Sequence, residues 1–145
     1  MIKSKSLITG AVLWALLSTS QATMYVIGNQ HAPTSEFSRN TTIDLFMGRA
    51  RAFSNGQRAT PFDLPANSRE RHAFYRKLVG FSPAQLNSYW SRLTFSGRTL
   101  PPYQLPSEDR IVDMVCKNPA AIAYVSSKPT SDCVKVLIEV DASIN

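Results

Sequence analysis

Residues 67–78 read Asn-Ser-Arg-Glu-Arg-His-Ala-Phe-Tyr-Arg-Lys-Leu and have the pattern of a helix with a capped first turn. Asn67 is a favourable N-cap, and Glu70 stands three residues later, where a capping box places its carboxylate. Residues 59–64 before it have the composition of a strand, so the helix is expected to begin at the carboxyl edge of a sheet. Ligands of open α/β sheets bind at that edge.

The start of this helix is a candidate anion site. Arg69 and Arg71 add positive charge beside backbone N–H groups that have no partner within the helix. An ordinary capped surface helix with two solvated arginines would have the same local sequence, so both interpretations stay open at this point.

The first 22 residues have the features of a secretory signal peptide. Lys3 and Lys5 precede an apolar run over residues 7–17, and residues 20–22, Ser-Gln-Ala, suit a signal peptidase. The apolar run is shorter than the roughly 20 residues that a membrane-spanning helix needs. Cleavage would leave residues 23–145 as one compact domain with no membrane span, in the periplasm or secreted.

The charge balance favours an anionic partner. Without Lys3 and Lys5 the chain has 14 basic and 10 acidic side chains, a net charge of +4. We expect an anionic ligand, an acidic partner or lipid headgroups, and no nucleic acid, because an exported protein does not normally meet it.

The sequence predicts a disulfide and no metal site, cofactor or enzyme activity. Cys116 and Cys133 are the two cysteines, and they are expected to pair in an oxidising compartment. His31 and His72 stand at no zinc-like spacing, and neither a dinucleotide nor a phosphate-loop motif is present. Ser68 and His72 are four residues apart, but no nucleophile elbow or third orienting group accompanies them.

The remaining pattern predicts an α/β sandwich around a small mixed sheet. Strands are expected over residues 24–27, 59–64, 120–125 and 134–140. The expected helices are one capped by Thr41 or Thr42, the helix over residues 67–80, one capped by Ser82 and one capped by Ser107. The third of these has the clearest apolar stripe, which should face the core and consists of Leu86, Tyr89, Trp90 and Leu93.

The order of these motifs resembles the phosphate-binding proteins of ABC phosphate transporters. Residues 43–49, IDLFMGR, are similar to the I-F-x-G-K helix of that family, and residues 118–125, NPAAIAYV, to its P-G-A-I-G-Y-V strand. Residues 74–97 are especially similar to a subgroup of short, exported, single-lobe proteins. The resemblance implies one lobe of a type II periplasmic-binding-protein-like fold, a three-layer α/β sandwich with a small mixed sheet.

The resemblance also implies a function, the binding of phosphate or a similar small oxyanion at the helix N-terminus. Ser68, Arg69 and Arg71 would contact the anion, and Thr34 and Ser35, in the loop after the first strand, are weaker candidates for the same edge. One lobe leaves a face of the ligand in water, so a homodimer or a protein partner in the envelope is expected to complete the site.

The alternative is an interaction module that has kept the fold without the ligand. Arg69 and Glu70 stand where the family has the Gly and Thr of an S-G-T anion-binding turn, and the Glu70 carboxylate would repel an oxyanion. Such a module would dock on a membrane sensor, transporter or envelope assembly. Residues 98–106, which include Leu100 and Tyr103, are the expected contact.

Overall fold

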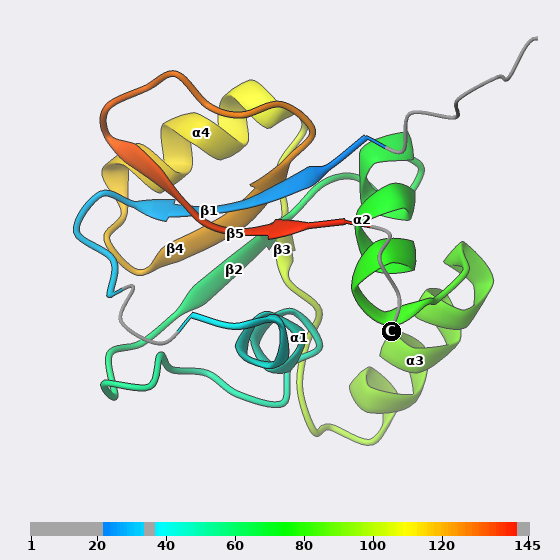
Figure 1. The fold of residues 1–145 in the computed structure, drawn as a ribbon. Coiled ribbons are helices and arrows are strands. Elements are labelled where there is room, and N and C mark those ends of the chain that lie inside the picture. Colours follow the sequence, from blue (N-terminus) through cyan, green and yellow to red (C-terminus); the bar gives the residue numbers. More distant parts are fainter. Residues whose placement is uncertain (1–21, 34–36, 142–145) are drawn as a thin grey trace, which may run out of the picture.

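The computed structural model describes residues 22–33 and 37–141 and contains one mixed sheet (Figure 1). Its strands are β1 (Met24–Asn29), β2 (Thr60–Asp63), β3 (Tyr103–Gln104), β4 (Ala121–Val125) and β5 (Val134–Val140), in the spatial order β3-β2-β4-β1-β5. β1 pairs antiparallel with β4 and β5, whereas β2 runs parallel to β3 and β4. The predicted mixed sheet is therefore confirmed, and β3 is an additional edge strand that the sequence did not predict.

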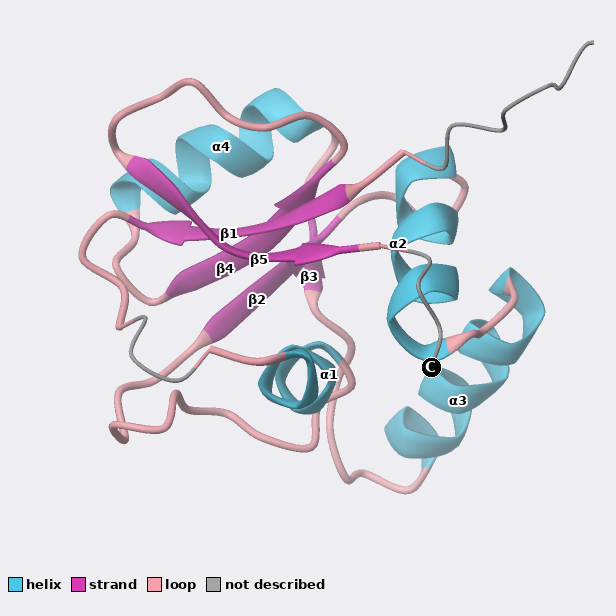
Figure 2. Cartoon of the chain, in the orientation of Figure 1, coloured by secondary structure: helices cyan, strands magenta, loops and turns pink. Residues whose placement is uncertain are grey.

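Helices cover both faces of this sheet (Figure 2). In the described ranges they are α1 (Arg39–Phe46), α2 (Arg69–Val79), α3 (Pro83–Phe95) and α4 (Glu108–Lys117). α4 lies on one face, α1 and α2 lie on the other, and α3 lies beyond α2 on the side away from α4. The three-layer α/β architecture is confirmed. No helix of residues 22–33 and 37–141 is long and apolar enough to cross a membrane.

Aromatic packing on β4 fixes α1 and α2 against the sheet. β4 is buried along its whole length, as expected for a strand with helices on both faces. The Tyr124 ring stacks on Phe74 of α2 with centroids 3.8 Å apart and meets Phe46 of α1 edge-on at 6.0 Å. Such pairs contribute beyond the area that they bury, and here they hold α1 and α2 against β4.

α2 begins one residue later than predicted. Ser68 is the N-cap, and its hydroxyl oxygen accepts the backbone N–H of Arg71 at 3.1 Å. The predicted capping box of Asn67 and Glu70 is therefore wrong, because the third residue after the actual cap is Arg71. Gly80 ends the helix in a left-handed conformation, as its position predicted.

α1 begins earlier than predicted, at Arg39, with Ser38 as its N-cap. Thr42 is buried in the first turn, and its hydroxyl donates to the Ser38 carbonyl at 2.9 Å. The Thr42 hydroxyl thus has its hydrogen-bond partner within the helix. Ser38 is the N-cap of α1, and neither Thr41 nor Thr42 has that role. The caps predicted for α3 and α4 are both confirmed.

α3 packs on the end of α1 through the predicted apolar stripe. Leu86 and Trp90 are buried, and Tyr89 and Leu93 are partly buried against the core. The Tyr89 hydroxyl donates to the Met47 carbonyl at 2.6 Å, which ties α3 to the residue that follows α1. The side of α3 next to Trp90 stays available to line surface hollows.

The predicted disulfide is present at the end of α4. Cys116 and Cys133 are bonded, with their Cα atoms 5.0 Å apart. The side-chain amide of Asn29 donates to the carbonyl oxygens of Val115 at 2.9 Å and Cys116 at 3.0 Å. These contacts join the C-terminus of α4 to β1 and to the residue before β5.

Candidate anion-binding site

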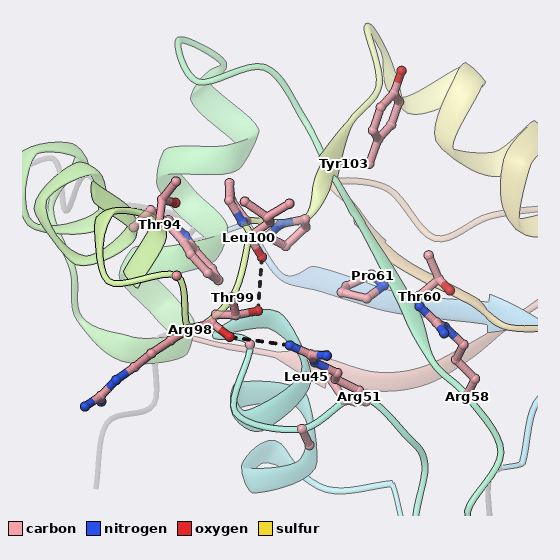
Figure 3. Close-up of a pocket in the computed structure, with 16 residues that line it drawn as sticks. Leu45, Arg51, Arg58, Thr60, Pro61, Thr94, Arg98, Thr99, Leu100 and Tyr103 are labelled. Carbon is pink, nitrogen blue, oxygen red and sulfur yellow. Dashed lines mark hydrogen bonds between the residues drawn. The ribbon is translucent and has the colours of Figure 1, made fainter. Parts of the chain in front are cut away.

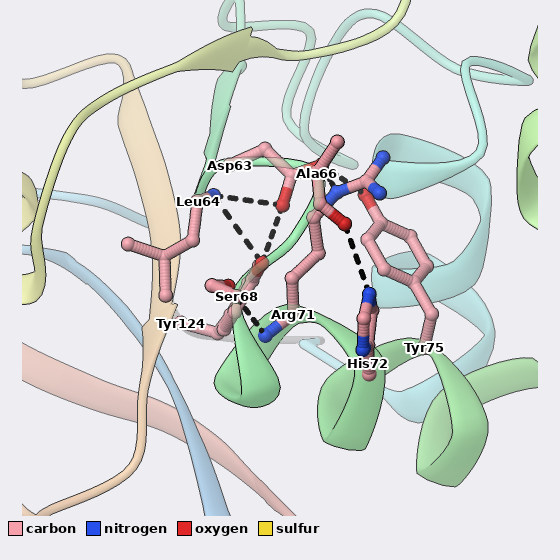
Figure 4. A network of polar contacts seen from close by, with 8 residues as sticks. All are labelled: Asp63, Leu64, Ala66, Ser68, Arg71, His72, Tyr75 and Tyr124. Atoms are coloured by element: carbon pink, nitrogen blue, oxygen red, sulfur yellow. Dashed lines mark hydrogen bonds and ion pairs between the residues drawn. The ribbon is translucent and has the colours of Figure 1, made fainter. Parts of the chain in front are cut away.

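The carboxylate of Asp63, the last residue of β2, lies at the centre of a buried polar network (Figure 4). Its Oδ1 accepts hydrogen bonds from the Leu64 backbone N–H at 2.8 Å and from the Tyr124 hydroxyl. Its Oδ2 accepts from the Tyr75 hydroxyl at 3.1 Å and from Arg71 Nε at 2.9 Å. Four donors converge on one carboxylate and offset the cost of its burial.

Arg71, in the first turn of α2, uses only one edge of its guanidinium in this network. Its side chain is 4% exposed and lies 5.3 Å over the Tyr75 ring, a cation–π geometry. Among the described residues, no hydrogen bond or ion pair joins either Nη atom to another group. Asp63 therefore fixes the position of the guanidinium and leaves its outer donors for a further acceptor.

The charge states of the network follow from its burial. Burial lowers the pKa of the Arg71 guanidinium, but the charge and hydrogen bond of Asp63 outweigh this effect and bring the pKa above its ordinary value. Burial, and after it the charge of Asp63, raises the pKa of the Tyr75 and Tyr124 hydroxyls well above the usual range. At neutral pH the arginine is a cation and both phenols are neutral donors.

Arg71 lines a pocket of about 510 Å³ between the start of α2, one side of α3 and β3. α3 contributes Asn87, Ser91 and Thr94, which stand four and three residues apart and so share one helix face. Gln104 of β3 adds another amide. The rest of the lining is apolar and consists of Ala66, Trp90, Phe95 and Pro101.

This lining is suited to a small oxyanion. It combines one fixed cation with two hydroxyls and two amides, and no carboxylate is among the described residues that line it. Cation–oxyanion hydrogen bonds are roughly twice as strong as neutral ones. Within the described part of the chain, no cluster of His, Cys, Asp and Glu could hold a metal ion.

The structure brings together some of the predicted site residues. Ser68 and Arg71 meet in the first turn of α2, but only Arg71 lines the pocket. Arg69 is exposed, makes no hydrogen bond or ion pair with another described residue, and does not line the pocket. Thr34 and Ser35 lie outside the described residues. His72 Nε2 lies 2.9 Å from the Ala66 carbonyl oxygen, so this ring nitrogen contacts the backbone.

Sequence reasoning did not identify Asp63 or the α3 side of the pocket. One signal for Asp63 was available, since a carboxylate between Phe62 and Leu64 in a strand needs a buried partner. For Asn87, Ser91, Thr94 and Gln104 no local signal existed, because their role depends on where α3 and β3 pack.

Two solved structures have a similar fold. One is an ABC-type phosphate transport receptor from Vibrio cholerae, with a TM-score of 0.60 and 16% identity over 80% of this chain and 46% of that chain. The other is a putative phosphate ABC transporter substrate-binding protein with bound phosphate from Clostridium perfringens, with a TM-score of 0.62 and 18% identity over 80% of this chain and 45% of that chain. This chain thus spans less than half the length of either protein.

At this identity the likeness shows the fold. It confirms, for the fold, the resemblance to phosphate-binding proteins of ABC transporters that the sequence motifs indicated. The two similar proteins are a transport receptor and a substrate-binding protein, and neither is named as an enzyme. No protein-family model and no curated protein matches the chain.

Proposed function

We propose that this protein binds a small oxyanion, with phosphate as the first candidate, in the pocket lined by Arg71. The observation that supports this function is the arrangement of the buried guanidinium, which Asp63 holds through Nε alone. An arginine that only neutralised a carboxylate would favour a two-bond fork to both oxygens. Here Oδ1 is taken by Leu64 and Tyr124, and the Nη donors face no described partner.

Two further features support an oxyanion. Ala66, which precedes the cap of α2, lines the same pocket, so the positive end of the α2 dipole adds to the arginine charge. The hydroxyls of Ser91 and Thr94 supply neutral donors from the facing helix. The similar protein from Clostridium perfringens was solved with bound phosphate, which makes phosphate the first anion to test.

We also infer that the protein acts outside the cytoplasm. The predicted signal peptide over residues 1–22, of which only Ala22 is among the described residues, supports export of residues 23–145 as one solute-binding-like domain. The pocket is open on one side, and a protein partner in the envelope or a second copy would cover a bound anion there.

Isothermal titration calorimetry tests the function directly. The protein is purified from the exported fraction with its disulfide formed and is titrated with phosphate and with sulfate at low salt. We expect saturable heat, and we expect the double variant Ser91→Ala/Thr94→Ala to bind at least about a hundredfold more weakly, because each lost hydrogen bond to a charged ligand costs about 1.5–3 kcal/mol.

The control is Ser88→Ala, an equally conservative change on the exposed side of α3 that does not line this pocket. It should leave the affinity unchanged. Absence of saturable heat up to millimolar anion, with a native circular dichroism spectrum, would contradict the proposed function. Equal anion affinity in wild type and the double variant would show that the anion binds outside this pocket.

A further inference from the structure

A second hollow lies between the end of α1, the start of β2 and residues 97–103 (Figure 3). Its volume is about 460 Å³. It shares Trp90, Thr94 and Pro101 with the pocket of Arg71, but Arg71 does not line it. We call it the arginine groove, because Arg51, Arg58 and Arg98 line it, although the Arg98 side chain extends away from it (Figure 3).

We propose that the arginine groove docks an acidic segment of a protein partner, whose apolar side chains contact Leu100 and Tyr103. This inference is independent of oxyanion binding, since it concerns a different hollow with different charged residues.

The first support is uncompensated charge. Arg51 and Arg58 are exposed, no carboxylate is among the described residues that line the groove, and neither arginine forms an ion pair with another described residue. To the described residues, Arg51 Nη2 donates one hydrogen bond, to the Arg98 backbone carbonyl at 3.4 Å. Residues 45–107 hold nine basic side chains and two acidic ones, of which Asp63 is committed to Arg71. The groove therefore favours an occupant that brings carboxylates.

The second support is exposed apolar surface in the same place. Leu100 and Tyr103 are 74% and 71% exposed, and both line the groove. Large apolar side chains gathered at a hollow mark interaction sites more often than scattered ones do. Pro101 and Pro102 connect Leu100 to Tyr103 and restrict the backbone of this segment. Little conformational entropy is therefore lost when a partner binds.

These two features together select the kind of occupant. A free inorganic anion would pair with the arginines and leave Leu100 and Tyr103 in water. An anionic bilayer is flat and would not fill a hollow that reaches Leu45 and Gly48. A protein segment that alternates carboxylate and apolar side chains meets both requirements, as arginine clusters that read acidic motifs do.

Fluorescence anisotropy with three short synthetic peptides tests the proposal on the full exported protein. The first peptide alternates glutamate with leucine, the second alternates lysine with leucine, and the third alternates glutamate with serine. We expect only the first to bind with a measurable affinity, and we expect added salt to weaken it, because exposed charges are screened.

Variants then locate the binding surface. Arg58→Glu and Leu100→Ser should each weaken binding of the first peptide about tenfold. Arg76→Glu is the matched control, since it reverses an exposed charge on α2 that does not line the groove, and it should change the affinity less than twofold. All three positions are exposed, and circular dichroism verifies that the variants fold.

Three results would overturn the proposal. One is absence of binding of the first peptide at millimolar concentration and low salt. Another is equal loss of binding in Arg76→Glu and Arg58→Glu, which would indicate net charge alone. The last is sedimentation with phosphatidylglycerol vesicles, or self-association, that Arg58→Glu abolishes while peptide binding is unchanged, which would identify a membrane or a second copy as the occupant.

Discussion

Arg71 donates its Nε–H to the Asp63 carboxylate across 2.9 Å, and the two side chains are only 4% and 1% exposed. Taking two charges out of water costs several kcal/mol for each ion, and their attraction offsets this cost only when further hydrogen bonds satisfy the carboxylate. Leu64, Tyr75 and Tyr124 provide those bonds. The pair is thus a fixed element that places the guanidinium at the pocket rather than a large source of stability.

Asp63→Asn is expected to destabilise the protein by about 3–5 kcal/mol, because it leaves the Arg71 guanidinium as an uncompensated buried charge. Urea unfolding followed by circular dichroism measures this loss. The control is Asp113→Asn, which removes a carboxylate that pairs with Lys117 and Arg110 on the surface of α4 and should leave stability unchanged. Similar midpoints for the two variants would show that the buried pair has no special role.

Stability is expected to fall above about pH 10, because Tyr75 and Tyr124 hold their protons more tightly when folded. An unfolded tyrosine ionises near pH 10, whereas burial and Asp63 raise the pKa of both folded tyrosines well above that value. The folded state therefore binds more protons in this range, so this contribution is complete below about pH 10 and is lost as the pH rises toward the folded pKa.

Urea unfolding at a series of pH values from about 9 to about 11 measures this slope. The double variant Tyr75→Phe/Tyr124→Phe cannot ionise at these positions, so its stability should decline less steeply than that of wild type. Parallel slopes for the two proteins would contradict the expected difference in proton binding.

Loss of the Cys116–Cys133 disulfide is expected to cost about 3 kcal/mol, since the bond closes a short loop of the unfolded chain. The sequence separation of the two cysteines is 17. Unfolding of the double variant Cys116→Ser/Cys133→Ser, compared with oxidised and with reduced wild type, measures the effect. Reduced wild type should match the double variant, and a match of all three samples would exclude a contribution of the bond to stability.

The sequence predicted the order of elements, because each boundary carries local chemistry. Pro83 after Ser82 specifies the start of α3, and Gly80 specifies the end of α2. β3 was missed because Tyr103–Gln104 is a two-residue strand after two prolines, and only its pairing with β2 identifies it. Local patterns thus predict long elements and not short pairings that depend on tertiary contacts.

The candidate site was only partly predictable for a related reason. Arg71 was selected for its place in a first helical turn, whereas its importance comes from Asp63, eight residues earlier on another element. Arg69 stands in the same first turn and has the same charge, but its side chain is exposed in the structure. Two arginines two residues apart on a helix point in different directions, so only one of them can lie on the buried face of α2. Which one is buried depends on how α2 packs against the core.

Gly48→Ala is expected to destabilise the protein more than Gly97→Ala, although both glycines have a left-handed φ, +71° and +70°. A Cβ at position 48 would lie 2.9 Å from Thr99 Cγ2 and 3.2 Å from Trp90 Cη2, whereas one at position 97 would meet nothing within 4 Å. Backbone strain alone costs about 1–2 kcal/mol, so Gly97→Ala should lose about that much. Gly48→Ala should lose more, because Trp90 is buried and cannot move freely. Urea unfolding of both variants measures the difference, which isolates the collision from the strain. If the two variants lose equal stability, then the side chains of Trp90 and Thr99 shift without an energetic cost. The Trp90 side chain, which lines both hollows, would then be more mobile than its burial indicates.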